Sequence, residues 1–341
     1  MDCLDEQALL DFLAGRLGGE ATARAREHVA RCELCNAVAT EVIRGAASQL
    51  RPDPLRATGY ELASGAVVTG KYRLVRPLGE GGMGVVWEAE ALARGGSAPR
   101  VAIKFLKAFD GVAKRRFVRE IAVTSGLVHA GLVRVVDVLE DVEAGCPALV
   151  MELLAGEPLT GRLARDARLD GREARSIARH LAHTLGVVHD AGLVHRDVKP
   201  ANVFLLDDPA RPVVLLDLGL AKIVSGAAPP TTRITRTGHA VGTPAYMAPE
   251  QLSGEASVDG RADLWSLGVM LYECVTGERP FAGRTVAEVL RAALRGPPPP
   301  MEGVDPSTAA VLRSLLRPER AERPASAAAV AAALARIDPD R

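Results

Sequence analysis

The sequence predicts an α+β fold in which a small strand-rich lobe precedes a large helical lobe, with a short all-α segment before both. Three observations predict it: a helical pattern with cysteines near the N-terminus, strand-like segments over residues 67–153, and mostly helical patterns over residues 154–339. Two lobes of different type enclose a cleft, where a small molecule would be expected to bind.

The composition is that of an ordinary globular protein. Of 341 residues, 48% are hydrophobic and 25% are charged, and 42 basic residues balance 42 acidic ones. A chain without net charge gives no support for nucleic acid or a membrane surface as a partner. No apolar stretch is long enough for a membrane span, and the acidic start Met1–Glu6 does not resemble a secretory signal, so we predict a cytoplasmic protein.

Residues 1–44 form the first predicted region, a helical module. Apolar residues recur there at helical spacing, and a second helical run extends from about Glu20 to Arg31. Residues 45–66 contain prolines and glycines without sustained periodicity, which predicts a linker.

The domain that follows, residues 67–339, begins with strands and continues with helices. The predicted strands are Tyr72–Leu78, Gly84–Ala91, Arg100–Leu106, Leu132–Glu140 and Ala148–Leu153. The most clearly patterned helices are Arg172–Asp190 and Arg261–Thr276.

A glycine-rich turn lies between the first two predicted strands. Residues 79–86 read GEGGMGVV and fit G-x-G-x-x-G-x-V, with glycines at Gly79, Gly81 and Gly84. Such glycines let a backbone approach phosphate groups without Cβ clashes. A dinucleotide-binding turn would continue into a helix, whereas this one continues as a strand. Alone, the motif is equally compatible with an ordinary glycine-rich turn.

The third predicted strand carries Lys104 in the sequence VAIK. Its ammonium group would neutralise phosphate charge if an acidic residue held it in place. Glu120 is the best candidate partner, because it lies in a helical run over residues 114–125. The alternative is a surface salt bridge, which would contribute little to stability.

Three further motifs follow in order. They are HRDVKPAN at residues 195–202, DLG at residues 217–219 and APE at residues 248–250. Together with the glycine-rich turn and Lys104, their order and spacing resemble the protein kinase family over residues 67–337. The resemblance implies the two-lobed protein kinase fold, with residues 67–153 and 154–339 as its two lobes.

Two local features resemble serine/threonine kinases of bacterial, eukaryotic-like type. Lys199 lies two residues after Asp197, and Gly242-Thr243-Pro244 precedes the APE motif. The family implies catalytic residues Asp197, Lys199, Lys104 and Glu120. Asp197 would orient the substrate hydroxyl and accept its proton. Asn202 and Asp217 would bind Mg²⁺ or Mn²⁺, which prefer oxygen ligands.

The resemblance also implies an ATP site between the lobes. The residues expected to bind the nucleotide are Leu78, Gly79, Gly81, Gly84, Val86, Ala102, Lys104, Met151, Glu152, Leu154 and Phe204. Met151 would be the gatekeeper, and backbone groups of Glu152 and Leu154 would hydrogen-bond adenine. Val86, Ala102 and Phe204 would enclose the ring, although core packing explains the same residue types.

An activation loop is expected between Asp217 and Glu250. Related bacterial kinases autophosphorylate at the positions of Thr235 and Thr237, where a phosphate would order the segment. The alternative is a threonine-rich loop without a regulatory role. Leu218 replaces the phenylalanine usual in the family. Leucine is also apolar, so the replacement is compatible with kinase activity, and it would shift the balance between the active and inactive states in a direction that the sequence does not give.

The resemblance implies two further contacts in the helical lobe. Asp263 would brace the catalytic loop, residues 195–202, and Glu250 would pair with Arg323. One predicted helix also contains three histidines, which we expect to be surface or core residues because no carboxylate cluster accompanies them: His180, His183 and His189.

Near the N-terminus, His28, Cys32 and Cys35 form an H-x₃-C-x₂-C pattern. His28 and Cys32 share one face of a helix, and Cys3 is the only other cysteine before residue 146. The pattern resembles the zinc-finger module of anti-sigma factors, in which an upstream cysteine completes a tetrahedral zinc site. Zinc would stabilise so small a module. Reduced surface thiols and a redox switch are the alternatives.

The sequence therefore predicts an Mg-ATP-dependent kinase that phosphorylates serine and threonine in protein substrates. One alternative is a pseudokinase scaffold, although Lys104, Asp197 and Asp217 are all present. A second makes residues 1–44 primary, binding a sigma factor or another regulator to which the kinase domain responds. A kinase homodimer is also left open.

Overall fold

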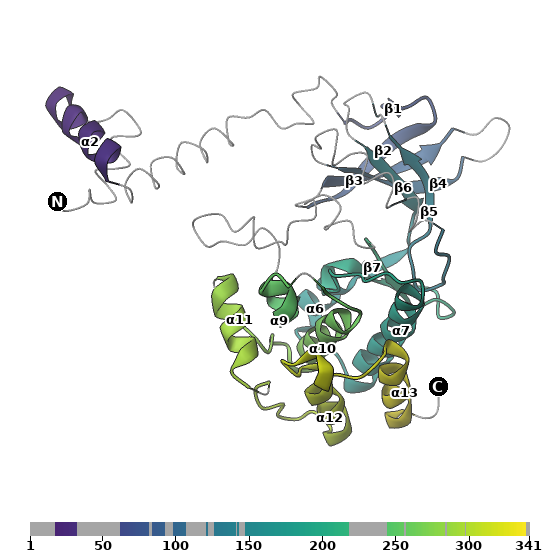
Figure 1. Cartoon of the computed structure of the whole chain (residues 1–341). Helices are drawn as coiled ribbons and strands as arrows, with labels where there is room; N and C mark the ends of the chain where they lie inside the picture. Colours follow the sequence, from purple (N-terminus) through teal and green to yellow (C-terminus); the bar gives the residue numbers. More distant parts are fainter. Residues whose placement is uncertain are drawn as a thin grey trace. The chain divides into compact units, whose positions relative to one another are not determined.

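The computed structural model describes residues 18–32, 62–81, 84–92, 98–106, 121, 126–140, 142, 147–217, 244–255, 257–283, 285–296 and 298–338. The chain forms two compact units, Met1–Glu61 and Leu62–Arg341 (Figure 1). None of the described helices is long and apolar enough to cross a membrane.

Within the first unit, the structure describes one helix, α2 (Gly19–Arg31). It starts one residue before the predicted run, so that prediction is confirmed. Cys32 caps its C-terminus, and the backbone N–H of Cys32 donates to the carbonyl of His28 over 2.8 Å.

The second unit begins with a six-stranded antiparallel sheet in the order β1-β2-β3-β4-β6-β5. Its strands are β1 (Val67–Val68), β2 (Tyr72–Gly81), β3 (Gly84–Ala91), β4 (Arg100–Leu106), β5 (Val135–Leu139) and β6 (Ala148–Glu152). The predicted strand Leu132–Glu140 is wrong at its start. Leu132 instead forms a parallel bridge with Leu215 of the helical lobe, which removes residues 132–134 from the sheet.

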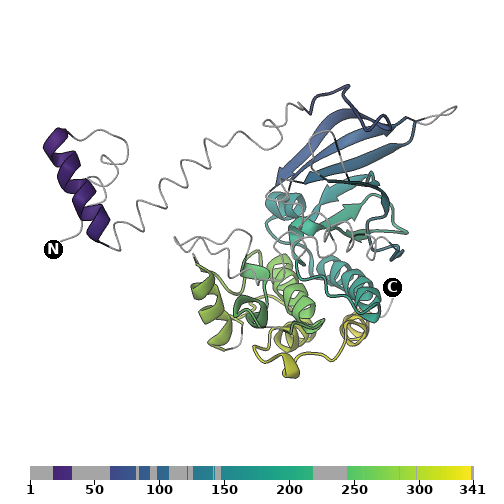
Figure 2. The same cartoon turned by 45° about the horizontal axis from the view of Figure 1, so that its top comes forward.

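The rest of this unit is mainly helical, and it lies on the other side of the unit from the six-stranded sheet in both views (Figures 1 and 2). The helices are α6 (Leu159–Asp166), α7 (Gly171–Asp190), α9 (Pro249–Leu252), α10 (Arg261–Thr276), α11 (Val286–Leu294), α12 (Pro306–Leu315) and α13 (Ala327–Ile337). Short 3-10 turns are η1 (Pro200–Asn202), η3 (Pro244–Tyr246) and η4 (Arg320–Glu322). A small sheet joins β7 (Gly156–Pro158), β8 (Val203–Leu206) and β9 (Val213–Leu215).

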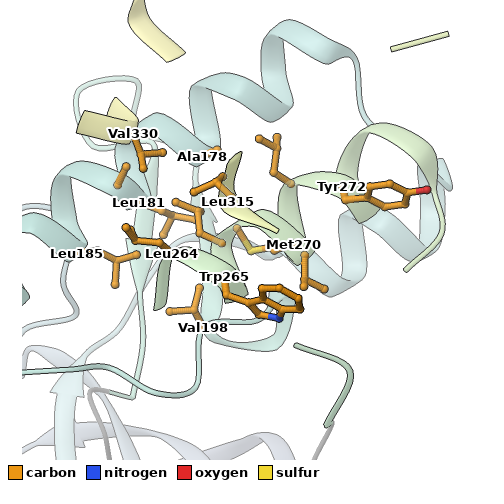
Figure 3. Packing of buried hydrophobic residues seen from close by; sticks show 14 of the residues in the cluster. Ala178, Leu181, Leu185, Val198, Leu264, Trp265, Met270, Tyr272, Leu315 and Val330 are labelled. Atoms are coloured by element: carbon orange, nitrogen blue, oxygen red, sulfur yellow. The ribbon is translucent and has the colours of Figure 1, made fainter. Parts of the chain in front are cut away.

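Helix α10 is the centre of the helical lobe. Of its 16 residues, 13 are buried, so it is a core helix rather than an amphipathic surface helix. Side chains of α7 and α12 pack against it, and α13 packs in turn on α7 and α12. Val198 of the catalytic loop joins the same cluster (Figure 3). Because Val198 is 1% exposed and stands between Asp197 and Lys199, the core anchors the catalytic loop directly.

Candidate active site

Lys104 and Asp217 come together from the two lobes. Lys104 lies on β4 and is 8% exposed, and Asp217 follows β9. The Lys104 Nζ donates to Asp217 Oδ2 over 2.5 Å, across a sequence separation of 113 residues. The structure therefore brings these two predicted residues together.

A second polar group lies in the catalytic loop. The Lys199 Nζ contacts both carboxylate oxygens of Asp197, at 2.8 and 2.7 Å. The Asn202 Nδ2 donates to the Asp197 carbonyl at 2.8 Å and to Asp197 Oδ2 at 2.9 Å. Because Asn202 donates through its nitrogen, its Oδ1 remains available as an acceptor or metal ligand.

Backbone pairing connects the two groups. Strand β8 begins at Val203, which pairs with Leu215 of β9, and the N–H of Leu216 donates to the Asn202 carbonyl at 2.8 Å. Asn202 and Asp217 therefore lie at neighbouring strand ends. Asp217 has a φ of 54°, a left-handed conformation that is uncommon outside glycine and that recurs at functional sites.

Asp263 of α10 braces the catalytic loop, as the sequence predicts. Its fully buried carboxylate accepts the backbone N–H groups of His195 at 2.8 Å and Arg196 at 2.7 Å. The His189 Nε2 contacts the same carboxylate at 2.8 Å. The sequence pattern did not reveal this carboxylate partner of His189, because α7 and α10 pack together across a sequence separation of 74 residues.

Glu250 and Arg323 form the predicted buried pair. Two hydrogen bonds of 2.7 and 2.8 Å join their planar groups. The guanidinium also donates to the carbonyls of Arg317 and Pro318 and lies 5.0 Å from the ring centroid of Trp265. Because the donors of the guanidinium are satisfied, the pair holds Glu250, and with it helix α9, against the core of the helical lobe.

The glycine-rich turn has two kinds of glycine. A Cβ on Gly84 would lie 1.9 Å from the carbonyl oxygen of Phe105, so β4 requires glycine there. A Cβ on Gly79 would meet nothing within 4 Å, so internal packing does not require that glycine.

The other predicted nucleotide contacts come from both lobes. Val86 is beside Lys104 in the sheet, and Ala102 is beside Met151. Ala102 and Met151 belong to one apolar cluster, against which Val86 packs. Phe204 is half-buried on β8, Leu78 is exposed on β2, and Glu152 and Leu154 lie at and just after the end of β6.

Glu152 has a partner that the sequence did not reveal. The guanidinium of Arg211, from the turn between β8 and β9, donates to both oxygens of the Glu152 carboxylate at 2.9 and 2.7 Å. Burial alone would raise the pKa of Glu152, but hydrogen bonds from Arg211 and from the N–H of Arg134 outweigh it and hold the pKa below its ordinary value. No local motif marks Arg211.

Comparison with known proteins agrees with this geometry. The family model described as the protein kinase domain matches residues 72–334, which is more than half of the chain. The chain belongs to the protein kinase family.

The relatives of this kinase domain include serine/threonine kinases of bacteria. Serine/threonine-protein kinase PknA of Mycobacterium tuberculosis is 42% identical over 245 residues, which cover 70% of this chain and 54% of PknA. The DNA damage-responsive serine/threonine-protein kinase RqkA of Deinococcus radiodurans is 39% identical, covering 81% of this chain and 41% of RqkA. The chain thus spans about half the length of these relatives or less.

A solved structure has the same fold. The crystal structure of the Mycobacterium tuberculosis PknI kinase domain superposes with a TM-score of 0.62 at 30% identity. The match covers 81% of this chain and 99% of the PknI chain. The two-lobed kinase fold is therefore confirmed for the second unit.

Some predicted residues of the kinase domain lie outside the described residues. They are Glu120, Leu218, Thr235 and Thr237. For Gly81, the structure gives the backbone in β2 but no account of its surroundings. The roles predicted for these positions stay predictions.

The predicted zinc ligands are partly described. His28 and Cys32 lie one turn apart at the end of α2, whereas Cys3 and Cys35 lie outside the described residues. The His28 Nε2 is buried and has no hydrogen-bond partner within the described part of the chain. Among the described residues, no three His, Cys, Asp or Glu side chains gather as a metal-binding group.

Proposed function

We propose that the protein is a serine/threonine protein kinase that transfers the γ-phosphate of ATP to serine and threonine hydroxyls of protein substrates. The observation that carries this proposal is the pair Lys104–Asp217 beside the group formed by Asp197, Lys199 and Asn202. Phosphoryl transfer depends on positioning and charge neutralisation, and these are the groups that would supply both.

Each polar residue has a role in this proposal. The Asp197 carboxylate orients the substrate hydroxyl and accepts its proton, and the Lys199 ammonium offsets charge on the transferred phosphoryl group. Lys104 neutralises the other phosphates, with Glu120 as its proposed partner in the nucleotide-bound state. Asn202 Oδ1 and an Asp217 carboxylate oxygen suit Mg²⁺ or Mn²⁺, because both are hard oxygen donors. When bound, the metal ion neutralises phosphate charge.

The adenine would lie against the hinge, which we define as residues 152–155, between β6 and β7. Backbone groups of Glu152 and Leu154 would hydrogen-bond the base, with Met151 behind it. Apolar contacts would come from Leu78, Val86, Ala102 and Phe204, and the phosphates would lie under Gly79, Gly81 and Gly84. The apolar cluster formed by Ala102 and Met151 supports this arrangement.

Purified protein incubated with γ-labelled ATP, Mg²⁺ and a generic protein substrate tests the proposal. We expect label on serine and threonine, and Asp197→Asn should lower the transfer rate about a hundredfold or more, the usual effect of a lost general base. A wild-type protein that binds ATP but transfers no phosphate would instead favour the pseudokinase alternative.

We also propose regulation by autophosphorylation at Thr235 and Thr237. Phosphates there would form charge-assisted hydrogen bonds with basic groups, of which Arg196 next to Asp197 is the natural candidate. Phosphosite mapping should find phosphate on one or both threonines in active protein. Full activity of the double alanine variant would contradict the proposal.

The N-terminal unit would hold structural zinc through Cys3, His28, Cys32 and Cys35. The buried, unpartnered Nε2 of His28 supports this, because an imidazole nitrogen without a hydrogen bond suits a metal ion. Metal analysis of the full chain should find about one zinc per molecule, and Cys32→Ser should lower it while Cys146→Ser does not. Equal zinc content in both variants would contradict the site.

Partners and location follow from the same proposal. Residues 1–44 would bind a sigma factor or another regulator, and the kinase domain would act on proteins in the cytoplasm, with a homodimer as a further assembly. Co-purification of a sigma factor with the full chain, lost in Cys32→Ser, would support the partner.

A further inference from the structure

Arg211 links three segments that are far apart in the sequence. Its Nε donates to the Ala130 carbonyl at 2.5 Å, and its Nη2 donates to the Leu132 carbonyl at 2.8 Å. The same guanidinium forms the two hydrogen bonds to the Glu152 carboxylate, at 2.9 and 2.7 Å. One side chain of the helical lobe thus contacts the connection before β5 and the start of the hinge.

Glu152 is fixed from a second direction as well. Its Oε1 accepts the N–H of Arg134 at 2.8 Å, and its own N–H donates to the Arg134 carbonyl at 3.0 Å. The Glu152 side chain is 16% exposed and that of Arg211 is 24% exposed, so water competes only weakly for these bonds. The carboxylate therefore has one well-defined position.

The turn that carries Arg211, residues 207–212, also holds the other end of the hinge. The N–H of Asp207 donates to the Ala155 carbonyl at 3.2 Å. The turn is itself ordered by Asp208, whose Oδ1 accepts the N–H of Ala210 at 2.9 Å and whose carbonyl accepts the N–H of Arg211 at 3.1 Å. Both ends of the four-residue hinge are thus attached to one turn.

A lysine could not reproduce this arrangement. A planar guanidinium can satisfy a carboxylate with two parallel bonds and still reach two carbonyls, whereas an ammonium is a point donor on a flexible stem. The pair Arg165–Glu157 in the same chain differs from Arg211–Glu152 in its exposure. The Arg165 side chain is 55% exposed, and an exposed ion pair of this kind contributes little to stability.

We infer that Arg211 is a positioning residue for the nucleotide base: it fixes the Glu152 carboxylate, and the 207–212 turn thereby holds the hinge backbone in the position that receives adenine. The inference rests on the proposed function only in taking the hinge as the base-binding segment. Arg211 itself touches neither the base nor the reacting atoms.

Binding of MgATP and of adenosine to the full chain separates this role from simple stabilisation. Arg211→Met should weaken the binding of both ligands by about five- to tenfold, because both bind at the hinge. A loss of this size corresponds to a fraction of the free energy of one charge-assisted hydrogen bond. Arg211→Lys should recover only part of the affinity. Asp208→Ala, which loosens the turn without touching Glu152, should show a smaller loss. Arg165→Met is the matched control, with unchanged affinity for both ligands.

Kinetics supply the second readout. In active protein, Arg211→Met should raise KM for ATP by a similar factor and change kcat by about twofold or less. The milder Glu152→Gln should shift KM in the same direction, which covers the case in which the methionine variant folds poorly.

Three outcomes would overturn the inference. One is unchanged adenosine affinity with a lowered Tm, which would make Arg211 a structural contact only. Another is a loss of affinity for MgATP but not for adenosine, which would mean that Arg211 affects the binding of the phosphates near Asp217 and not that of the base. The third is a wild-type chain that does not bind adenosine. If the wild type binds adenosine in an Arg211-dependent way but transfers no phosphate, the inference stands and the kinase proposal fails.

Discussion

At the scale of single residues, the buried carboxylate of Asp263 determines the conformation of the catalytic loop. It accepts hydrogen bonds from the backbone of His195 and Arg196 and contacts the ring of His189. The two backbone bonds hold Arg196 at a φ of 64°, a conformation that costs free energy unless its surroundings fix it. Asp197 follows directly, so its position depends on Asp263.

Asp263→Asn should therefore destabilise the helical lobe. The new amide group has one accepting oxygen, and its NH₂ would face donors, so the loop N–H groups lose a partner. We expect the free energy of unfolding to fall by about 2–4 kcal/mol in urea titrations. Asp190→Asn, exposed at the end of α7, should change it by about 0.5 kcal/mol or less. Equal stability of the two variants would contradict the bracing role.

Resemblance in sequence motifs predicted some of these residue contacts and missed others. Asp263 and the pair Glu250–Arg323 were predicted, because each lies in a recognisable motif or stands at a family position. The contacts of His189 and Arg211 were not, because their carboxylate partners are 74 and 59 residues away in the sequence and neither side chain stands in a motif. Such contacts arise from tertiary packing alone.

At the scale of elements, the sequence predicted the bounds of a helix or strand well where a residue such as glycine marks its end. Helix α10 ends as predicted, at Thr276, because Gly277 follows it with a φ of 81°. Strands β3 and β4 also match. The predicted start of β5 was wrong, because the strand-like sequence Leu132–Val136 does not show that Leu132 pairs with the distant Leu215.

Two helical glycines should respond in opposite ways to alanine. A Cβ at Gly186 in α7 would meet nothing within 4 Å, so Gly186→Ala should raise the free energy of unfolding by about 0.5–1 kcal/mol. A Cβ at Gly268 in α10 would lie 2.8 Å from the Leu315 Cβ, so Gly268→Ala should lower it by about 1–3 kcal/mol. Thermal or urea unfolding of the two variants checks this, and a stabilised Gly268→Ala would contradict the close α10–α12 packing.

At the scale of the whole molecule, the second unit is a kinase domain in which contacts from both lobes define the site. Lys104 comes from the strand-rich lobe, Asp217 and the catalytic loop come from the helical lobe, and the hinge connects the two. The order of motifs predicted this architecture, since each motif occupies the lobe that the family implies. The first unit has only α2 described, so its predicted zinc site could be compared with the structure only at His28 and Cys32.

Single-turnover phosphoryl transfer tests the central claim, that these residues form one Mg-ATP site competent for transfer. Wild type, Lys104→Met, Asp197→Asn and Asp217→Asn would be compared at saturating MgATP, with adenosine binding to verify the folded state. The account predicts rapid transfer by the wild type and losses of about a hundredfold or more in each variant, with adenosine binding retained. Wild-type transfer rates in any of the three variants, or no transfer by a wild type that binds MgATP, would contradict it.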